Sequence, residues 1–125
     1  HTDPERWQHL DEAAEFFSAL LDANIPKKCI ENPIPHRYAL ERIGNRKYTQ
    51  LIQPYMFGHM ETKATCLWLV GLDPLEPTTD LKEQTMALPA SQRGRIHRLP
   101  PGEDRWKLRS LTYQGIADAM ASQWG

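Results

Sequence analysis

The chain has 125 residues, of which 40% are hydrophobic and 25% charged, and this is the size and composition of one globular domain rather than of a disordered tail. Its longest apolar run, residues 66–70, is far shorter than the ~20 residues that cross a bilayer. Two cysteines are too few for a disulfide framework. We therefore expect a soluble, cytoplasmic protein with a single α/β domain over residues 1–125.

The near-neutral total charge conceals an alternation along the chain. Residues 1–24 carry six acids against one base, whereas residues 25–59 carry six bases against two acids. Residues 60–90 are again acidic, with five acids against two bases, and residues 91–125 are basic, with six bases against three acids. The basic segments predict either a surface for a polyanion such as DNA or a merely solvated face.

The first predicted element is an amphipathic helix from Asp3 to about Ala23. Asp3 can cap the free amide groups at its start, and Pro4 loses nothing at the first helical position. The apolar residues that recur at spacings of three and four predict one buried face, formed by Trp7, Leu10, Ala14, Phe17 and Leu21. A short strand over residues 27–31 follows and leads into a proline-rich turn.

Further elements alternate between helix and strand. A short helix over residues 37–43 is closed by Gly44, and strands are predicted over residues 48–53 and 65–69. The second is almost wholly apolar, which is typical of a strand covered on both faces. Prolines predict irregular structure over residues 73–110. A last helix runs from residue 112 or 113 to 123, with Ile116, Ala119 and Met120 on its inner face.

Three strands alternating with three helices indicate an α/β fold, but no glycine-rich turn follows the first strand as it does in a doubly wound domain. The chain is then either a small α/β domain complete in itself or the later part of a larger one. The apolar strand over residues 65–69 favours the second alternative, because it requires a neighbour on each side.

Three blocks, in order along nearly the whole chain, resemble the DNA cytosine methyltransferases of bacteriophages. The first block looks like the segment that this family carries in place of a Glu-Asn-Val motif, the second like the family's next block, and the third like its C-terminus. The matching residues are Cys29, Ile30, Glu31, Asn32 and Pro33; then residues 53–59 and 63–69; then Pro100, Pro101, residues 104–107, Arg109, residues 115–117, residues 119–121 and residues 123–125.

The resemblance implies the C-terminal strands and helices of a Rossmann-like class I methyltransferase fold, S-adenosylmethionine as cofactor and DNA as substrate. In cytosine-5 methyltransferases a Pro-Cys cysteine attacks C6 of a flipped cytosine, and the motif glutamate bonds the ring at N3. Glu31 matches that catalytic glutamate. Asn32, Pro33, His59 and Lys63 are expected around the base pocket. No Pro-Cys pair and no glycine-rich cofactor loop occur in the 125 residues, so the isolated chain is expected to be inactive.

Two further sets of residues are expected to contact ligands. The final helix resembles the motif that folds back beside the methyl donor, which makes Thr112 and Gly115 candidates for cofactor binding. The five histidines show no paired metal spacing, and no metal site is predicted. A basic segment predicts contacts with DNA phosphates, through Arg93, Arg95, Arg98, Arg105, Lys107 and Arg109.

Two other functions compete with cytosine methylation. Residues 32–35 can be read as a relative of the Asn-Pro-Pro-aromatic motif of amino methyltransferases, although Pro35 stands where the aromatic residue would be. Alternatively, the chain is a non-catalytic DNA-binding or interaction module with a methyltransferase-like fold. Either the enzyme or the module is compatible with the sequence alone, and neither the recognition sequence nor the oligomeric state follows from it.

Overall fold

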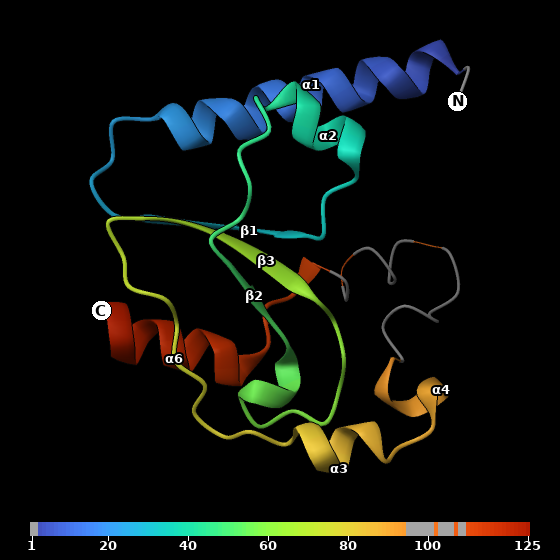
Figure 1. Cartoon of the computed structure of the whole chain (residues 1–125), viewed down its shortest axis with the longest axis vertical. Coiled ribbons are helices and arrows are strands. Elements are labelled where there is room, and N and C mark those ends of the chain that lie inside the picture. The colour runs from blue at the N-terminus through green and yellow to red at the C-terminus, as the bar shows by residue number, and fades with distance from the viewer. Residues whose placement is uncertain (1–2, 95–101, 103–106, 108–109) are drawn as a thin grey trace. The chain divides into compact units, whose positions relative to one another are not determined.

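A computed structural model describes residues 3–94 and 110–125, together with Gly102 and Lys107 (Figure 1). The chain divides into two compact units, and each is described by itself. The first unit comprises residues 1–50 and 66–73, and the second comprises residues 51–65 and 74–125. No helix among the described residues is long and apolar enough to span a membrane.

The first unit begins with helix α1 (Pro4–Asp22), which confirms the predicted amphipathic helix. The Asp3 carboxylate accepts hydrogen bonds from the amides of Glu5 and Arg6, at 3.1 and 3.4 Å. Ala14 is buried and Trp7 half-buried, whereas Phe16 on the other face is 67% exposed. The hydrophobic period therefore sets which side of α1 faces the protein.

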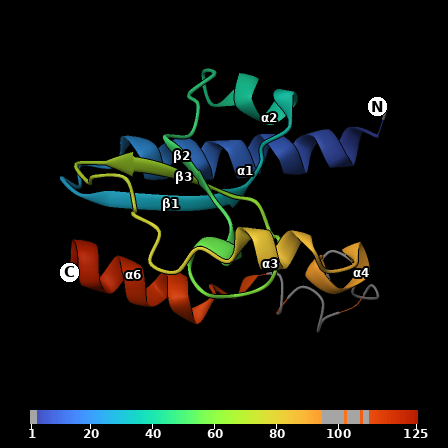
Figure 2. The same cartoon turned by 60° about the horizontal axis from the view of Figure 1, so that its bottom comes forward.

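Helix α2 (Arg37–Arg42) packs against α1, as Figures 1 and 2 show. It ends in a turn at Gly44, where φ is +75°, so the predicted glycine stop is confirmed. Arg42 forms an ion pair with Asp11 of α1, and Arg46 forms another with Asp22, whose N···O distance is 2.6 Å. These pairs join residues from the acidic and basic segments of the sequence.

Three strands, β1 (Lys28–Pro33), β2 (Gln50–Ile52) and β3 (Thr65–Val70), form an antiparallel sheet in the order β1-β3-β2. The last strand in the sequence is therefore the central one, which confirms that it has a neighbour on each side. Cys66, Leu67 and Trp68 are at most 3% exposed. The fold is thus mixed α/β, as expected, with a sheet that is small.

The second unit contains the 3-10 helix η1 (Pro54–Met56) and the helices α3 (Lys82–Met86), α4 (Ala90–Arg93) and α6 (Gln114–Trp124). Helix α3 packs against η1 (Figure 2). The prediction of irregular structure over residues 73–110 was wrong for α3 and α4. Prolines forbid long elements there, but helices of five and four residues fit between Pro77 and Pro101, with Pro89 at the start of α4.

The last helix confirms its prediction and closes the core of the second unit. Ile116 and Ala119 of α6 are 4% and 2% exposed, as the predicted inner face requires. They share this core with Ile52, Phe57 and Leu75, all at most 4% exposed. Thr85 of α3 is wholly buried, and its hydroxyl oxygen has no hydrogen-bond partner among the described residues.

Candidate functional site

Glu31 lies in the exposed half of β1. The strand is half-buried from Lys28 to Ile30 and exposed from Glu31 to Pro33. It extends through Pro33, two residues beyond the predicted end, so the chain turns after the Asn32 and Pro33 positions rather than at them. Glu31 therefore lies on the surface of the first unit.

Cys29 stands two residues before Glu31 on the same strand, and the structure explains why its thiol stays protonated. Burial, and secondly the negative charge of Glu31, raise the pKa of Cys29 to about 11. Burial also raises the pKa of Cys66, which is inaccessible to solvent. Because only the thiolate is a strong nucleophile, the chemistry of both cysteines is that of inert packing residues.

The second unit brings together three of the predicted site residues. The N–H of Gly115, in the first turn of α6, donates a hydrogen bond of 2.9 Å to Nε2 of His59. Nζ of Lys63 lies 3.4 Å from the carbonyl oxygen of Leu111 and 5.8 Å from the ring centroid of Tyr113. Residues 59–63 and 111–115 are thus in contact although about 50 positions separate them.

Two residues of this group were not predicted. The hydroxyl of Tyr113 donates a 2.6 Å hydrogen bond to Oε2 of Glu61, and its ring centroid lies 5.0 Å from that of His59. No local sequence signal marks either residue, because the pair is made by contacts distant in the chain. We call His59, Glu61, Lys63, Tyr113 and Gly115 the α6 start cluster.

Gly115 is needed in the cluster for steric reasons. A Cβ atom at this position would overlap the carbonyl oxygen of Phe57 and would lie 2.9 Å from Nε2 of His59. Real Cβ atoms essentially never make contacts shorter than 3.0 Å. The His59 ring accepts the amide hydrogen bond of Gly115 at Nε2, so a displaced ring would leave this N–H without its acceptor. The structure therefore gives both residues a role in holding the start of α6.

The two candidate cofactor residues have different surroundings. The amide of Gly115 is bonded to His59, and the space beside its Cα is filled by Phe57. Thr112 is exposed. Within residues 3–94 and 110–125, no group of three or more His, Cys, Asp or Glu side chains is placed to hold a metal ion.

Of the basic residues predicted to contact DNA, Arg93 has hydrogen-bond partners within the protein. The guanidinium of Arg93 donates to the carbonyl oxygens of Met86 and Leu88, at 3.3 and 2.9 Å, and so caps the end of α3. Lys107 is exposed. The other four predicted DNA contacts lie outside the described residues, namely Arg95, Arg98, Arg105 and Arg109.

Lys28 in the basic segment 25–59 also has an internal partner. Its Nζ donates to the carbonyl oxygens of Leu20, Leu21 and Ala23, at 2.8 Å to Leu20 and 2.9 Å to Ala23. A cation at this end complements the negative pole of the α1 dipole. With the Arg42 and Arg46 ion pairs, three of the six bases in this segment therefore contact α1.

No protein-family model matches the chain, and neither a curated protein nor a solved structure gives a significant match.

Proposed function

We propose that the chain is the C-terminal part of an S-adenosylmethionine-dependent DNA cytosine-5 methyltransferase of the phage type, and that Glu31 is its base-binding carboxylate. The observation that carries the proposal is the exposure of Glu31 in the one block that resembles the family's catalytic motif. In this proposal Glu31 binds N3 of a flipped cytosine. There the carboxyl group disperses the charge that develops on the ring when a nucleophile attacks C6.

The state of the two thiols supports placing the nucleophile outside these 125 residues. Cytosine methylation needs a thiolate near neutral pH, but the pKa of Cys29 is raised to about 11 and Cys66 is inaccessible. Because the 125 residues contain no glycine-rich cofactor loop, most of the methyl-donor pocket would also lie outside this chain, with Thr112 at its margin.

The sheet is compatible with the end of a Rossmann-like domain. Strands β1 and β2 are both antiparallel to β3, so they run parallel to each other. Doubly wound folds commonly carry an antiparallel strand on an otherwise parallel sheet. In the described sheet β1 is an edge strand, and an edge strand is where further parallel strands would be added. Strand β1, which contains Glu31, would then be an inner strand of the larger sheet.

The test is tritiated methyl transfer to cytosine-containing DNA by the longer protein that supplies the nucleophile. Glu31→Gln preserves shape but cannot exchange a proton with the ring, so the rate should fall by roughly a hundredfold or more. Glu31→Asp should also be slow, because a carboxyl group withdrawn by one methylene is misplaced for the reaction. Glu41→Gln, at an exposed acid of α2, is the matched control and should keep the wild-type rate.

Thermal melts of all three variants check folding, and Glu31→Gln should unfold within about 0.5 kcal/mol of wild type because Glu31 is exposed. A wild-type rate in Glu31→Gln would remove Glu31 from the mechanism. A longer protein that binds DNA but transfers no methyl group would instead favour the non-catalytic module. The 125 residues alone should show no micromolar binding of S-adenosylmethionine by calorimetry.

A further inference from the structure

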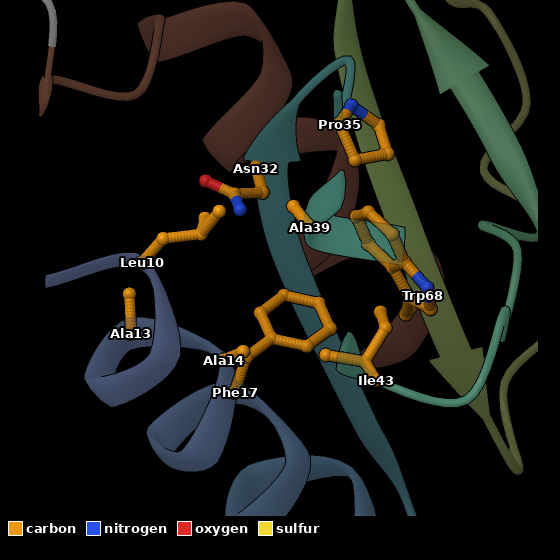
Figure 3. A pocket seen from close by; sticks show the side chains of 9 residues that line it. All are labelled: Leu10, Ala13, Ala14, Phe17, Asn32, Pro35, Ala39, Ile43 and Trp68. Atoms are coloured by element: carbon orange, nitrogen blue, oxygen red, sulfur yellow. The ribbon is translucent and has the colours of Figure 1, made fainter. Parts of the chain in front are cut away.

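The first unit contains an apolar pocket of about 150 Å³ (Figure 3). Small side chains on both helices create it, because Ala13 and Ala14 of α1 and Ala39 of α2 leave space that larger residues would fill. Phe17 and Trp68 form aromatic walls, and their ring centroids stand 4.8 Å apart in an edge-to-face arrangement. The pocket is therefore bounded by rigid groups of the helices and the sheet.

Contacts beside the pocket join α2 to α1. The ion pair of Arg42 with Asp11 fixes α2 to α1, and the Arg42 guanidinium also lies 5.0 Å from the ring centroid of Trp7. Trp7 in turn packs against Tyr38, with ring centroids 5.2 Å apart. The two helices that line the pocket are therefore held together by contacts outside it.

The polar groups that line the pocket are few. Nε1 of Trp68 donates a 2.9 Å hydrogen bond to the carbonyl oxygen of Arg46, so it is not available to a ligand. Asn32, which is exposed, is the other polar side chain among the described residues that line the pocket. A buried water requires two to four polar partners. Water in this pocket is therefore poorly held and readily displaced.

We propose that this pocket binds a single six-membered aromatic ring that carries one hydrogen-bonding substituent. A cavity of this volume accommodates one benzene-sized ring when its lining is apolar. The ring packs between Ala14, Ala39, Phe17 and Trp68, and its substituent bonds to the amide of Asn32. The inference does not depend on the proposed methylation, because Asn32 and the two helices define the pocket without Glu31.

Phenol is the probe, benzene is its counterpart without the hydroxyl group, and binding is followed by NMR of alanine methyl groups. Phenol should saturate with a dissociation constant below about 1 mM, and the shifts should be largest at Ala14 and Ala39. Asn32→Ala should weaken phenol by about three- to tenfold, the value of one hydrogen bond, and leave benzene unchanged. Ala39→Leu adds three carbon atoms inside the pocket and should abolish binding of both.

Ala19→Leu is the matched control, since it places the same change on the exposed face of α1 and should bind both probes as wild type does. Absence of saturation up to 10 mM, on the order of a tenfold excess over the expected constant, would overturn the proposal. So would saturation that moves methyl groups outside the pocket, or that survives Ala39→Leu. If Ala39→Leu does not fold, the position of the shifts in the wild-type chain decides the question.

Discussion

Replacing Gly115 with alanine tests the packing of α6 directly. The added Cβ would overlap the backbone oxygen of Phe57, which cannot rotate away as a side chain could. Such overpacking costs about 3 kcal/mol, and displacing His59 from the Gly115 amide costs about 1 kcal/mol more. Alanine regains about 1 kcal/mol as the better helix former. The net expectation is a loss of about 3 kcal/mol in the free energy of unfolding.

Urea unfolding followed by circular dichroism measures this loss, and thermal melts should show a midpoint lower by roughly 12 °C for a chain of this size. Gly94→Ala is the control, because its Cβ would meet no described atom closer than 3.2 Å, and it should unfold within about 1 kcal/mol of wild type. The two changes His59→Ala and Gly115→Ala should be non-additive, since the residues share one contact. A Gly115→Ala protein as stable as wild type would refute the close approach of α6 to Phe57.

Thr85→Val keeps the shape of the buried side chain but removes a hydroxyl without a described partner. It should therefore raise the free energy of unfolding, measured by urea titration, by about 1 kcal/mol, and a destabilised variant would show that the hydroxyl is bonded. Alkylation of Cys29 by iodoacetamide should be slow at pH 8 and become faster towards pH 11, and fast reaction at neutral pH would contradict the burial of the thiol. The stability that the protonated thiol contributes should be complete below pH 9.0 and lost as the pH rises through about 11. Arg93→Ala should lower stability by about 1–3 kcal/mol because it leaves the Met86 and Leu88 carbonyls uncapped, but it should leave the salt dependence of DNA binding unchanged. That salt dependence should flatten, on all sequences alike, when alanine replaces the predicted phosphate contacts, namely Arg95, Arg98 and Arg105.

The candidate site shows how far motif reasoning reaches. Glu31 was selected because the block at residues 29–33 resembles a family motif, and the structure places all five residues of this block in β1. His59 and Lys63 were selected from the second block and Gly115 from the third, and the structure brings the three residues together. Their partners Glu61 and Tyr113 could not be predicted, because the hydrogen bond between them joins positions 52 residues apart.

The helices and strands were determined largely by local sequence. Asp3 and Pro4 start α1, Gly44 stops the turn after α2, and the apolar run at residues 66–68 makes a buried central strand. These features act within a few residues, so periodicity and capping rules predict them. The two short helices between prolines escaped prediction, because four or five residues are too few to show a period.

Only the tertiary structure decided what the charges do. The alternation of acidic and basic segments is visible in the sequence, and it is equally compatible with a DNA surface and with internal pairing. Ion pairs to Asp11 and Asp22, and the bonds of Lys28 to the end of α1, show that this basic segment serves the fold in part. The interaction energy of a charge depends on its distance to other charges in space. Folding sets these distances, because it brings together residues up to 31 positions apart in the chain.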